Sequence, residues 1–199
     1  MTYIPFFPFP LMIGLLIIVF IGFLLRKRGR VYILGITLFG LYTLALMDAM
    51  FFPFRITEGW PSSVSQFEIT NTLKHSLNLI PFNFGNLFSY AALGKISYRI
   101  VFWQTTGNIL ITIPFGLGTG FLTKVRGWRI LLVALGTGFS LEGMQFIFIL
   151  LGVGNAHVID INDLLLNALG VLVGYGLYLA IRRVASKVRP IRSVSLNHP

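Results

Sequence analysis

Five long apolar stretches divide this chain, and shorter polar segments separate them. A helix needs roughly 20 largely apolar residues to cross the hydrocarbon core of a bilayer. Lipid offers the backbone no hydrogen-bond partner, so a helix is the conformation expected of each stretch. The predicted spans are residues 6–25, 31–54, 100–122, 130–151 and 161–181. The pattern therefore predicts an all-α integral membrane protein, a five-helix transmembrane bundle.

The long connection, residues 55–99, changes character along its length. Residues 58–71 are polar, whereas residues 73–93 are rich in Leu, Ile and Phe and are interrupted by Pro81 and Gly85. Proline and glycine break helical pattern. We therefore expect an outer interfacial segment of short amphipathic pieces on the membrane surface. The alternative is an irregular apolar loop, which contact with lipid disfavours.

Polar and small residues recur every three or four positions in the last three spans, so each span has one polar face. The stripes are Gln104, Asn108, Thr112, Gly116 and Gly120, then Ala134, Gly138, Glu142 and Gln145, then Asp160, Asp163, Asn167, Gly170 and Gly174. Small residues let helices approach closely, so these helices should face one another. Because successive spans alternate in direction, most of the polar groups fall in one half of the bilayer. We expect them to converge on one outward-opening cavity.

Composition supports the membrane reading and narrows the chemistry. Hydrophobic residues make up 55% of the 199 residues, charged residues only 11%, and the mean hydropathy is +0.81. A water-soluble domain of this size would need far more charge on its surface. The absence of cysteine excludes disulfides, thiolate metal sites and a cysteine nucleophile. We expect no metal and no cofactor, and no catalytic residue is assigned.

The cations define an orientation. With the segment after the first span in the cytoplasm, 12 of the 16 basic residues lie inside. These are Arg26, Lys27, Arg28, Arg30, Lys124, Arg126, Arg129, Arg182, Arg183, Lys187, Arg189 and Arg192. The positive-inside rule then places the N-terminus outside and the C-terminus in the cytoplasm. The net charge of +10 is explained by anionic membrane lipids and needs no nucleic acid.

Three regions follow from this topology. Residues 1–30 form an N-terminal anchor helix and basic loop, residues 31–183 the main transmembrane domain, and residues 184–199 a basic cytoplasmic tail. The first span is read as a retained anchor, because its basic cluster follows the apolar run and no small-residue cleavage site comes after it.

Glu142 stands out among the polar residues of the spans. Asn and Gln in membrane helices often serve only as interhelical hydrogen-bond partners, worth about 0.6 kcal/mol each. Ionisable groups at a helix centre cost about 2.5–3.5 kcal/mol on insertion scales, so they are usually retained for function. A protonated carboxyl with a structural role is the alternative for Glu142. Asp48 lies closer to a span end, where it can reach water.

Four fragments in order resemble VanZ-like proteins over roughly residues 31–183. They are Asn78-Leu79-Ile80-Pro81-Phe82, then Gly107-Asn108 with Pro114-Phe115-Gly116, then Ser140-Leu141-Glu142-Gly143-Met144-Gln145, then Asp160-Ile161-Asn162-Asp163 with Asn167 and Gly170. The resemblance implies a bacterial plasma-membrane protein whose namesake is associated with low-level resistance to teicoplanin, a lipid-tailed glycopeptide. His157 stands where the family typically has Arg. A neutral imidazole would bind an anion or carboxylate more weakly there.

Two main functions are consistent with these residues. The first is binding of a membrane lipid or a lipid-tailed glycopeptide at the outer leaflet. Its ligand-binding residues would be Glu142, Gln145, Asn108, Asp160, Asp163, Asn167 and Asn78, with Lys74, Lys95 and Arg99 contacting the headgroup. The second is an intramembrane enzyme acting on a lipid or cell-wall precursor, and a small transporter is a further alternative. Binding is the preferred interpretation. The oligomeric state is unassigned.

The topology can be tested by cysteine labelling, since the chain has no native thiol. Ser63→Cys and Asn155→Cys should react with an impermeant thiol reagent in intact cells, and Ser186→Cys should not, because the cation distribution orients the chain. Labelling of the residue-186 variant from outside would overturn the topology.

Overall fold

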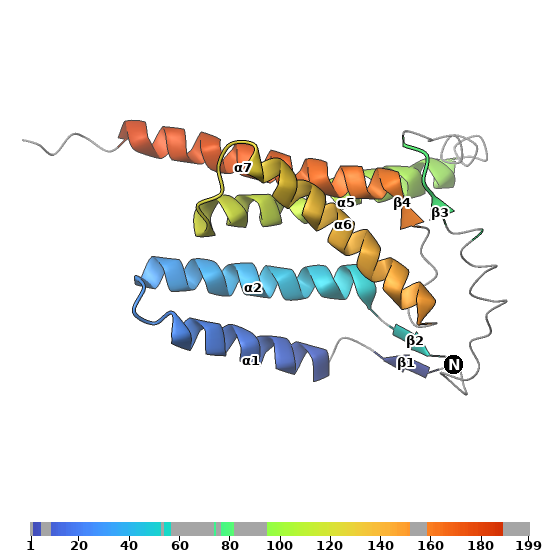
Figure 1. Ribbon diagram of the computed structural model, residues 1–199, viewed down its shortest axis with the longest axis horizontal. Coiled ribbons are helices and arrows are strands. Elements are labelled where there is room, and N and C mark those ends of the chain that lie inside the picture. Colours follow the sequence, from blue (N-terminus) through green and yellow to red (C-terminus); the bar gives the residue numbers. More distant parts are fainter. Residues whose placement is uncertain are drawn as a thin grey trace, which may run out of the picture.

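A computed structural model describes residues 2–4, 9–52, 54–56, 74, 77–81, 95–151 and 159–188. Five helices make up most of this part and lie roughly along one long axis (Figure 1). They are α1 (Phe9–Leu24), α2 (Arg30–Phe51), α5 (Lys95–Leu122), α6 (Arg129–Leu150) and α7 (Ile161–Val188). The predicted all-α five-helix bundle is confirmed. Helix α5 begins before its predicted apolar span, and helix α7 ends after its predicted span.

Two short strand pairs lie at one end of the bundle, which we call the strand end (Figure 1). Strand β1 (Thr2–Ile4) pairs antiparallel with β2 (Phe54–Ile56), and β3 (Leu77–Asn78) pairs in parallel with β4 (Ile159–Asp160). Strands this short carry no detectable period in the sequence. The predicted interfacial segment lies outside the described residues, apart from Lys74 and the part that holds β3 and its following turn.

The distribution of apolar residues is that of a membrane protein. Three helical segments are long and apolar enough to cross a bilayer, Arg30–Phe51, Arg129–Leu150 and Ile161–Lys187. The apolar helix α1 is shorter, and polar residues and proline lower the mean hydropathy of α5. Large apolar side chains such as Phe139 (71% exposed) face outward, whereas Thr112 and Glu142 are buried. A water-soluble bundle has the opposite arrangement.

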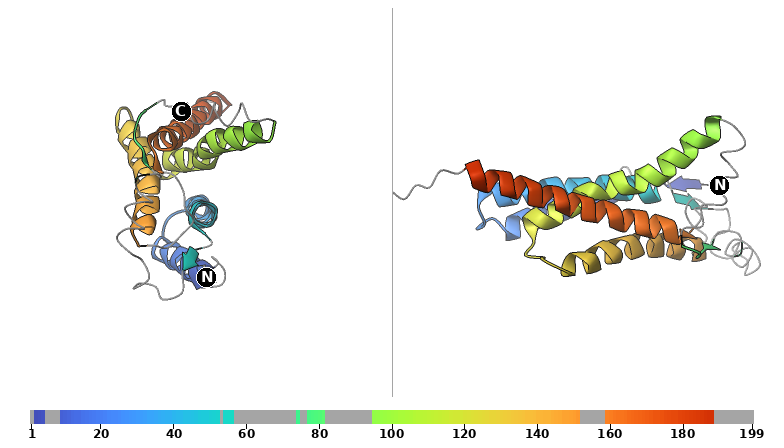
Figure 2. Two further views of the ribbon diagram at one scale, coloured as in Figure 1. Left: turned by 90° about the vertical axis from the view of Figure 1, so that its right-hand side faces the viewer. Right: turned by 90° about the horizontal axis from the view of Figure 1, so that it is seen from above.

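Helices α5 and α7 form the closest pair and run parallel from the strand end (Figure 2). Glycine makes this approach possible from both sides. A Cβ atom on Gly116 of α5 would clash with the Val171 carbonyl of α7, and a Cβ on Gly174 of α7 would clash with the Ile113 carbonyl of α5. The predicted glycine contacts are thereby confirmed. Pro114 does not break α5, which continues through it to Leu122.

The other helices are arranged around this pair, with α6 and α2 on different sides (Figure 2). Gly138 of α6 lies against the Leu164 carbonyl of α7. On the α2 side, the Phe39 ring lies against Gly118, and the Tyr42 hydroxyl donates a hydrogen bond to the Ile111 carbonyl of α5. Helix α1 packs on α2, which separates α1 from the α5–α7 pair. The core that positions the polar residues is therefore formed by α5, α6 and α7.

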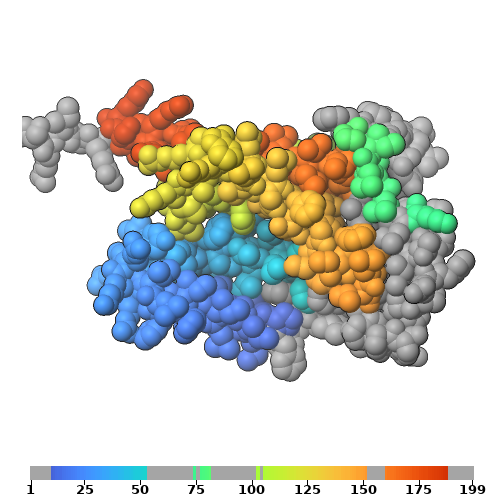
Figure 3. All heavy atoms as spheres, in the orientation of Figure 1, coloured from blue at the N-terminus to red at the C-terminus, as the bar shows by residue number. Residues whose placement is uncertain are grey.

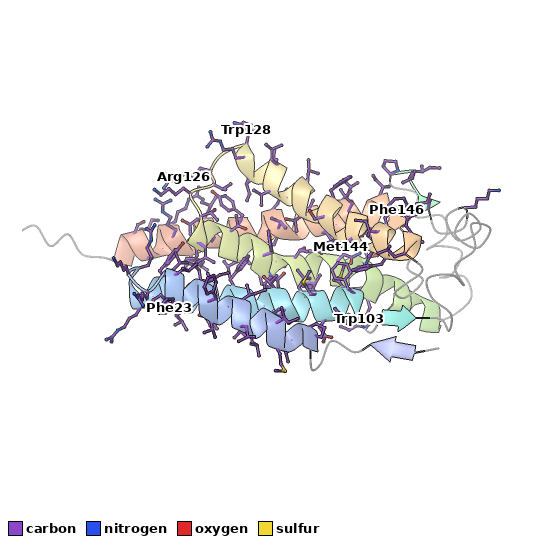
Figure 4. The ribbon with its side chains drawn as sticks, turned by 60° about the horizontal axis from the view of Figure 1, so that its bottom comes forward. Phe23, Trp103, Arg126, Trp128, Met144 and Phe146 are labelled. Atoms are coloured by element: carbon purple, nitrogen blue, oxygen red, sulfur yellow. The ribbon has the colours of Figure 1, made fainter. Side chains whose placement is uncertain are left out.

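The end opposite the strands is rich in cations, and we call it the basic end. It carries the loops 25–29 and 123–128 and the last turns of α7 (Figure 1). Figure 4 shows Arg126 and Phe23 toward this end and Trp103 and Phe146 toward the other. The exposed cations here are Arg26, Lys27, Arg28, Arg30, Lys124, Arg126, Arg129, Arg182, Arg183 and Lys187. Their clustering fits one polar face of a membrane.

The close approach of α5 and α7 predicts a strong effect from a single methyl group. Gly116→Ala should lower the free energy of unfolding by about 1–3 kcal/mol, because the new Cβ meets backbone that must shift. Gly136→Ala is the matched control, since it lies on the exposed face of α6 with nothing near the added Cβ. Alanine there should be neutral or stabilise by up to about 1 kcal/mol. Thermal unfolding in detergent measures both, and equal stability of the two variants would refute the packing.

Candidate functional site

Asp160 is the last residue of β4 and precedes the first residue of α7. Its side chain contacts both β3 and the first turn of α7. Its Oδ1 accepts a hydrogen bond from the Asn162 backbone N–H at 2.8 Å, as expected of an aspartate that caps a helix N-terminus. Its Oδ2 accepts from the Asn78 side-chain amide at 3.0 Å. The register of β3 and β4 places Asn78 and Asp160 directly opposite each other. Figure 3 shows residues 77–81, in green, beside the atoms of α6 and α7 at the strand end.

Glu142 lies next to the backbone of Asp160. It is 6% exposed, and its Oε2 accepts a hydrogen bond from the Asp160 backbone N–H at 3.3 Å. Its helix α6 runs antiparallel to α7, and Gly138 one turn earlier lets the two helices approach at Leu164. That approach brings a carboxyl group from the interior of one helix to the N-terminus of another. The positive end of a helix dipole favours a carboxylate at this position.

Asp163 completes a group of three carboxyls with Glu142 and Asp160, which we call the acidic cluster. Asp163 is half-buried in the first turn of α7 and accepts a hydrogen bond from the side-chain amide of Asn108 on α5. Both aspartates act electrostatically on Glu142. Within the described ranges, none of the neighbours that act on the charge of Glu142 or Asp163 is basic. The cluster is therefore suited to hydrogen-bond donors and to positive charge.

Asn167 lies one helical turn deeper than Asp163 on the same face of α7. It is fully buried, and its backbone carbonyl accepts a hydrogen bond from the Thr112 hydroxyl of α5 at 2.9 Å. Neither its amide oxygen nor its amide nitrogen has a hydrogen-bond partner in the part of the chain that the structure describes. Buried side-chain amides are rarely left in this state.

The structure thus brings together five of the predicted site residues, with Asn167 adjoining them. The five are Asn78, Asn108, Glu142, Asp160 and Asp163, from β3, α5, α6 and the β4–α7 junction. Gln145 is half-buried on α6, three residues after Glu142, and its place in the site stays a prediction. An outward-opening cavity stays a prediction.

The remaining predicted residues are exposed or lie outside the part of the chain that the structure describes. Lys74 is exposed, and Asp48 is exposed on α2. The side chains of Lys95, Arg99 and Gln104 lie outside the described residues, and so does His157. Headgroup contact by the three basic residues therefore stays a prediction. No group of three or more His, Cys, Asp or Glu suited to a metal ion occurs among the residues described.

Sequence reasoning missed the hydroxyl contacts between elements. Thr112 was recognised only as part of a stripe, yet its hydroxyl links α5 to the Asn167 carbonyl. The Tyr175 hydroxyl donates to the Val125 carbonyl at 3.0 Å and fastens the loop between α5 and α6 onto α7. Helical spacing shows which face a side chain occupies. It gives no signal of the partner on another helix.

A comparison with known families bears directly on these residues. The sequence profile of VanZ/LLP1 matches residues 39–182, which is most of the chain. The chain belongs to the VanZ/LLP1 family. The matched VanZ/LLP1 region contains the whole acidic cluster together with Asn78, Asn108 and Asn167, and it excludes α1. Comparisons with curated proteins and with solved structures gave no match. The resemblance to VanZ-like proteins is confirmed.

The capping geometry of Asp160 predicts unequal effects of two substitutions. Asp160→Ala should lower the free energy of unfolding by about 0.5–2 kcal/mol, because it removes the cap of α7, and Asp160→Asn should cost less, because asparagine also caps helices. Asp48→Ala is the control, an aspartate removed from an exposed position near the same end. Chemical unfolding in detergent measures the three variants. Equal losses for Ala and Asn at position 160 would contradict the capping role.

Proposed function

We propose that this VanZ/LLP1 protein binds the polar head of an amphiphile at the outer leaflet of a bacterial plasma membrane. The ligand is a membrane lipid or a lipid-tailed glycopeptide of the teicoplanin type. The observation that carries the proposal is the meeting of the acidic cluster with Asn78 and Asn108 at the strand end. Four elements contribute polar groups to one place, at a cost that membrane proteins usually incur for function.

In the orientation predicted from the cations, this site would lie at the outer leaflet. The exposed cations of the basic end would face the cytoplasm, beside anionic headgroups. The strand end, with the acidic cluster, then faces outward, and so does the N-terminus. Lys74, Lys95 and Arg99 belong to the same side, where their charges would meet a ligand phosphate.

The chemistry of the site favours binding over catalysis. The carboxyl groups are held by backbone or amide donors, Asp160 by Asn78 and Asn162 and Asp163 by Asn108. Such fixed acceptors orient a polar head, while exposed apolar side chains on the helices provide a surface for the tail. The contact between Asn78 and Asp160 joins the outer connection to the bundle, so a ligand on that connection would lie next to the cluster.

Expression in a susceptible Gram-positive host tests the proposal. The wild-type protein should raise tolerance to teicoplanin with little change for vancomycin, which lacks the lipid tail. Glu142→Gln should abolish the effect, because it keeps the volume of the side chain and removes only the ionisable group. Minimum inhibitory concentrations for both drugs are the measurement, with membrane levels of each variant measured in parallel.

The matched control is Asp48→Asn, which makes the same acid-to-amide change at an exposed position on α2. It should retain full tolerance. A wild-type protein that inserts normally and shifts neither drug would refute the antibiotic ligand. Full activity of the Glu142→Gln variant would instead show that the ionisable group is not needed and that Glu142 has a structural role.

A further inference from the structure

The buried amide of Asn167 is among the predicted ligand-binding residues, but the proposal above does not depend on it. Its side chain is 0% exposed between α5 and α7, and both polar atoms of its amide lack partners among the residues that the structure describes. Burying an amide without a hydrogen bond costs on the order of 1–3 kcal/mol by protein mutational data. A leucine of similar size would avoid that cost. The retained amide therefore points to a ligand that it contacts.

The geometry of α7 directs this amide toward the acidic cluster. Side chains on a helix lean toward its N-terminus, and the N-terminus of α7 lies at the strand end. Asn167 therefore leans toward Asp163, one turn earlier on the same face. The bond from the Thr112 hydroxyl to the Asn167 carbonyl holds this turn against α5, where Asn108 lies one turn above Thr112.

The three carboxyl groups of the acidic cluster differ in how many of their oxygens already accept hydrogen bonds. Both oxygens of Asp160 already accept hydrogen bonds, from Asn78 and from the Asn162 backbone. Glu142 accepts one bond through Oε2, which leaves Oε1 for a further donor. Asp163 accepts from Asn108 and retains acceptor capacity, since a carboxylate has about four lone-pair sites. Glu142, Asp163 and Asn167 are therefore the residues with oxygens to offer.

We propose that Glu142, Asp163 and Asn167 together bind a primary ammonium group, so the ligand is an amine-bearing lipid such as an aminophospholipid. This inference rests on the proposed function and specifies the headgroup that the site selects. A primary ammonium carries three N–H donors, and these residues supply one acceptor each. Its positive charge also relieves the repulsion between the carboxyls, which have no basic neighbour among the described residues.

An organic cation fits the donor set better than a divalent metal ion does. Calcium takes 6–8 oxygen ligands, and magnesium requires near-octahedral geometry. The described part of the chain has no group of three or more acidic or histidine residues arranged for a metal. An ammonium group needs only directed hydrogen-bond acceptors on one side, and the rest of the lipid head remains free toward the outer leaflet.

A headgroup series on the full-length wild-type protein tests this inference without any substitution. Short-chain phosphatidylethanolamine and its N-acetyl derivative have the same tails and phosphate, and only the first has an ammonium group. Calorimetric titration in detergent should give an affinity for phosphatidylethanolamine at least about tenfold higher, because charge-assisted hydrogen bonds are lost on acetylation. Equal affinity for the two lipids, or no binding of either, overturns the inference.

Variants locate the ammonium group on the named residues. Glu142→Gln and Asp163→Asn should each abolish the preference for phosphatidylethanolamine, and Asn167→Leu should reduce it. The control Asp48→Asn should retain it. A preference that survives in both acid variants overturns the inference.

Salt titrations separate the ammonium group from an inorganic cation. Sodium chloride and choline chloride at matched ionic strength should weaken binding equally. Specific competition by sodium would assign the acceptors to that ion and overturn the inference. The teicoplanin assay tests the proposed function separately. A protein that gives tolerance yet shows no preference for the amine would support the proposed function and overturn only the inference about the ammonium group.

Discussion

The approach of α5 to α7 is the contact on which the rest of the structure depends. Gly116 and Gly174 remove the side chains that would otherwise separate the two helices, so backbone carbonyls of each helix lie against the other. Without a hydrophobic driving force between helices in lipid, such close packing is a principal source of association. The same register places Thr112 opposite Asn167 and Asn108 beside Asp163. The packing that stabilises the pair therefore also positions the site.

Lipid as the solvent explains how polar residues are distributed. Most buried hydroxyls donate to backbone carbonyls, as Thr119 does to Phe115 at 2.9 Å within its own helix. These groups cost little because they are satisfied locally. Glu142 and Asn167 differ, because one is a buried carboxyl beside other carboxyls and the other is an amide without a described partner. Burying these two groups costs free energy, and both belong to the same polar region of the bundle.

Charge divides the molecule along its length. The exposed cations of three segments far apart in sequence meet at the basic end, and the acidic cluster lies toward the strand end. The alternating direction of the helices produces this division, since each loop returns the chain to the same two ends. The exposed cations and the acidic cluster therefore lie toward opposite ends of the bundle. The short pairing of β3 with β4 then connects residues 77–78 of the long connection to the cluster.

The sequence by itself determined the helices, their faces and the division of charge. Apolar length follows from bilayer thickness, and the period of a helix places Asn108 with Thr112, and Asp163 with Asn167, on single faces. Helical period contains no information about which residue faces which across an interface. Only the tertiary structure decided that Asn78 meets Asp160 and that Asp160 caps α7. These relations depend on a two-residue strand and on the rotation and register of packed helices, where glycines lie close against the backbone of the neighbouring helix.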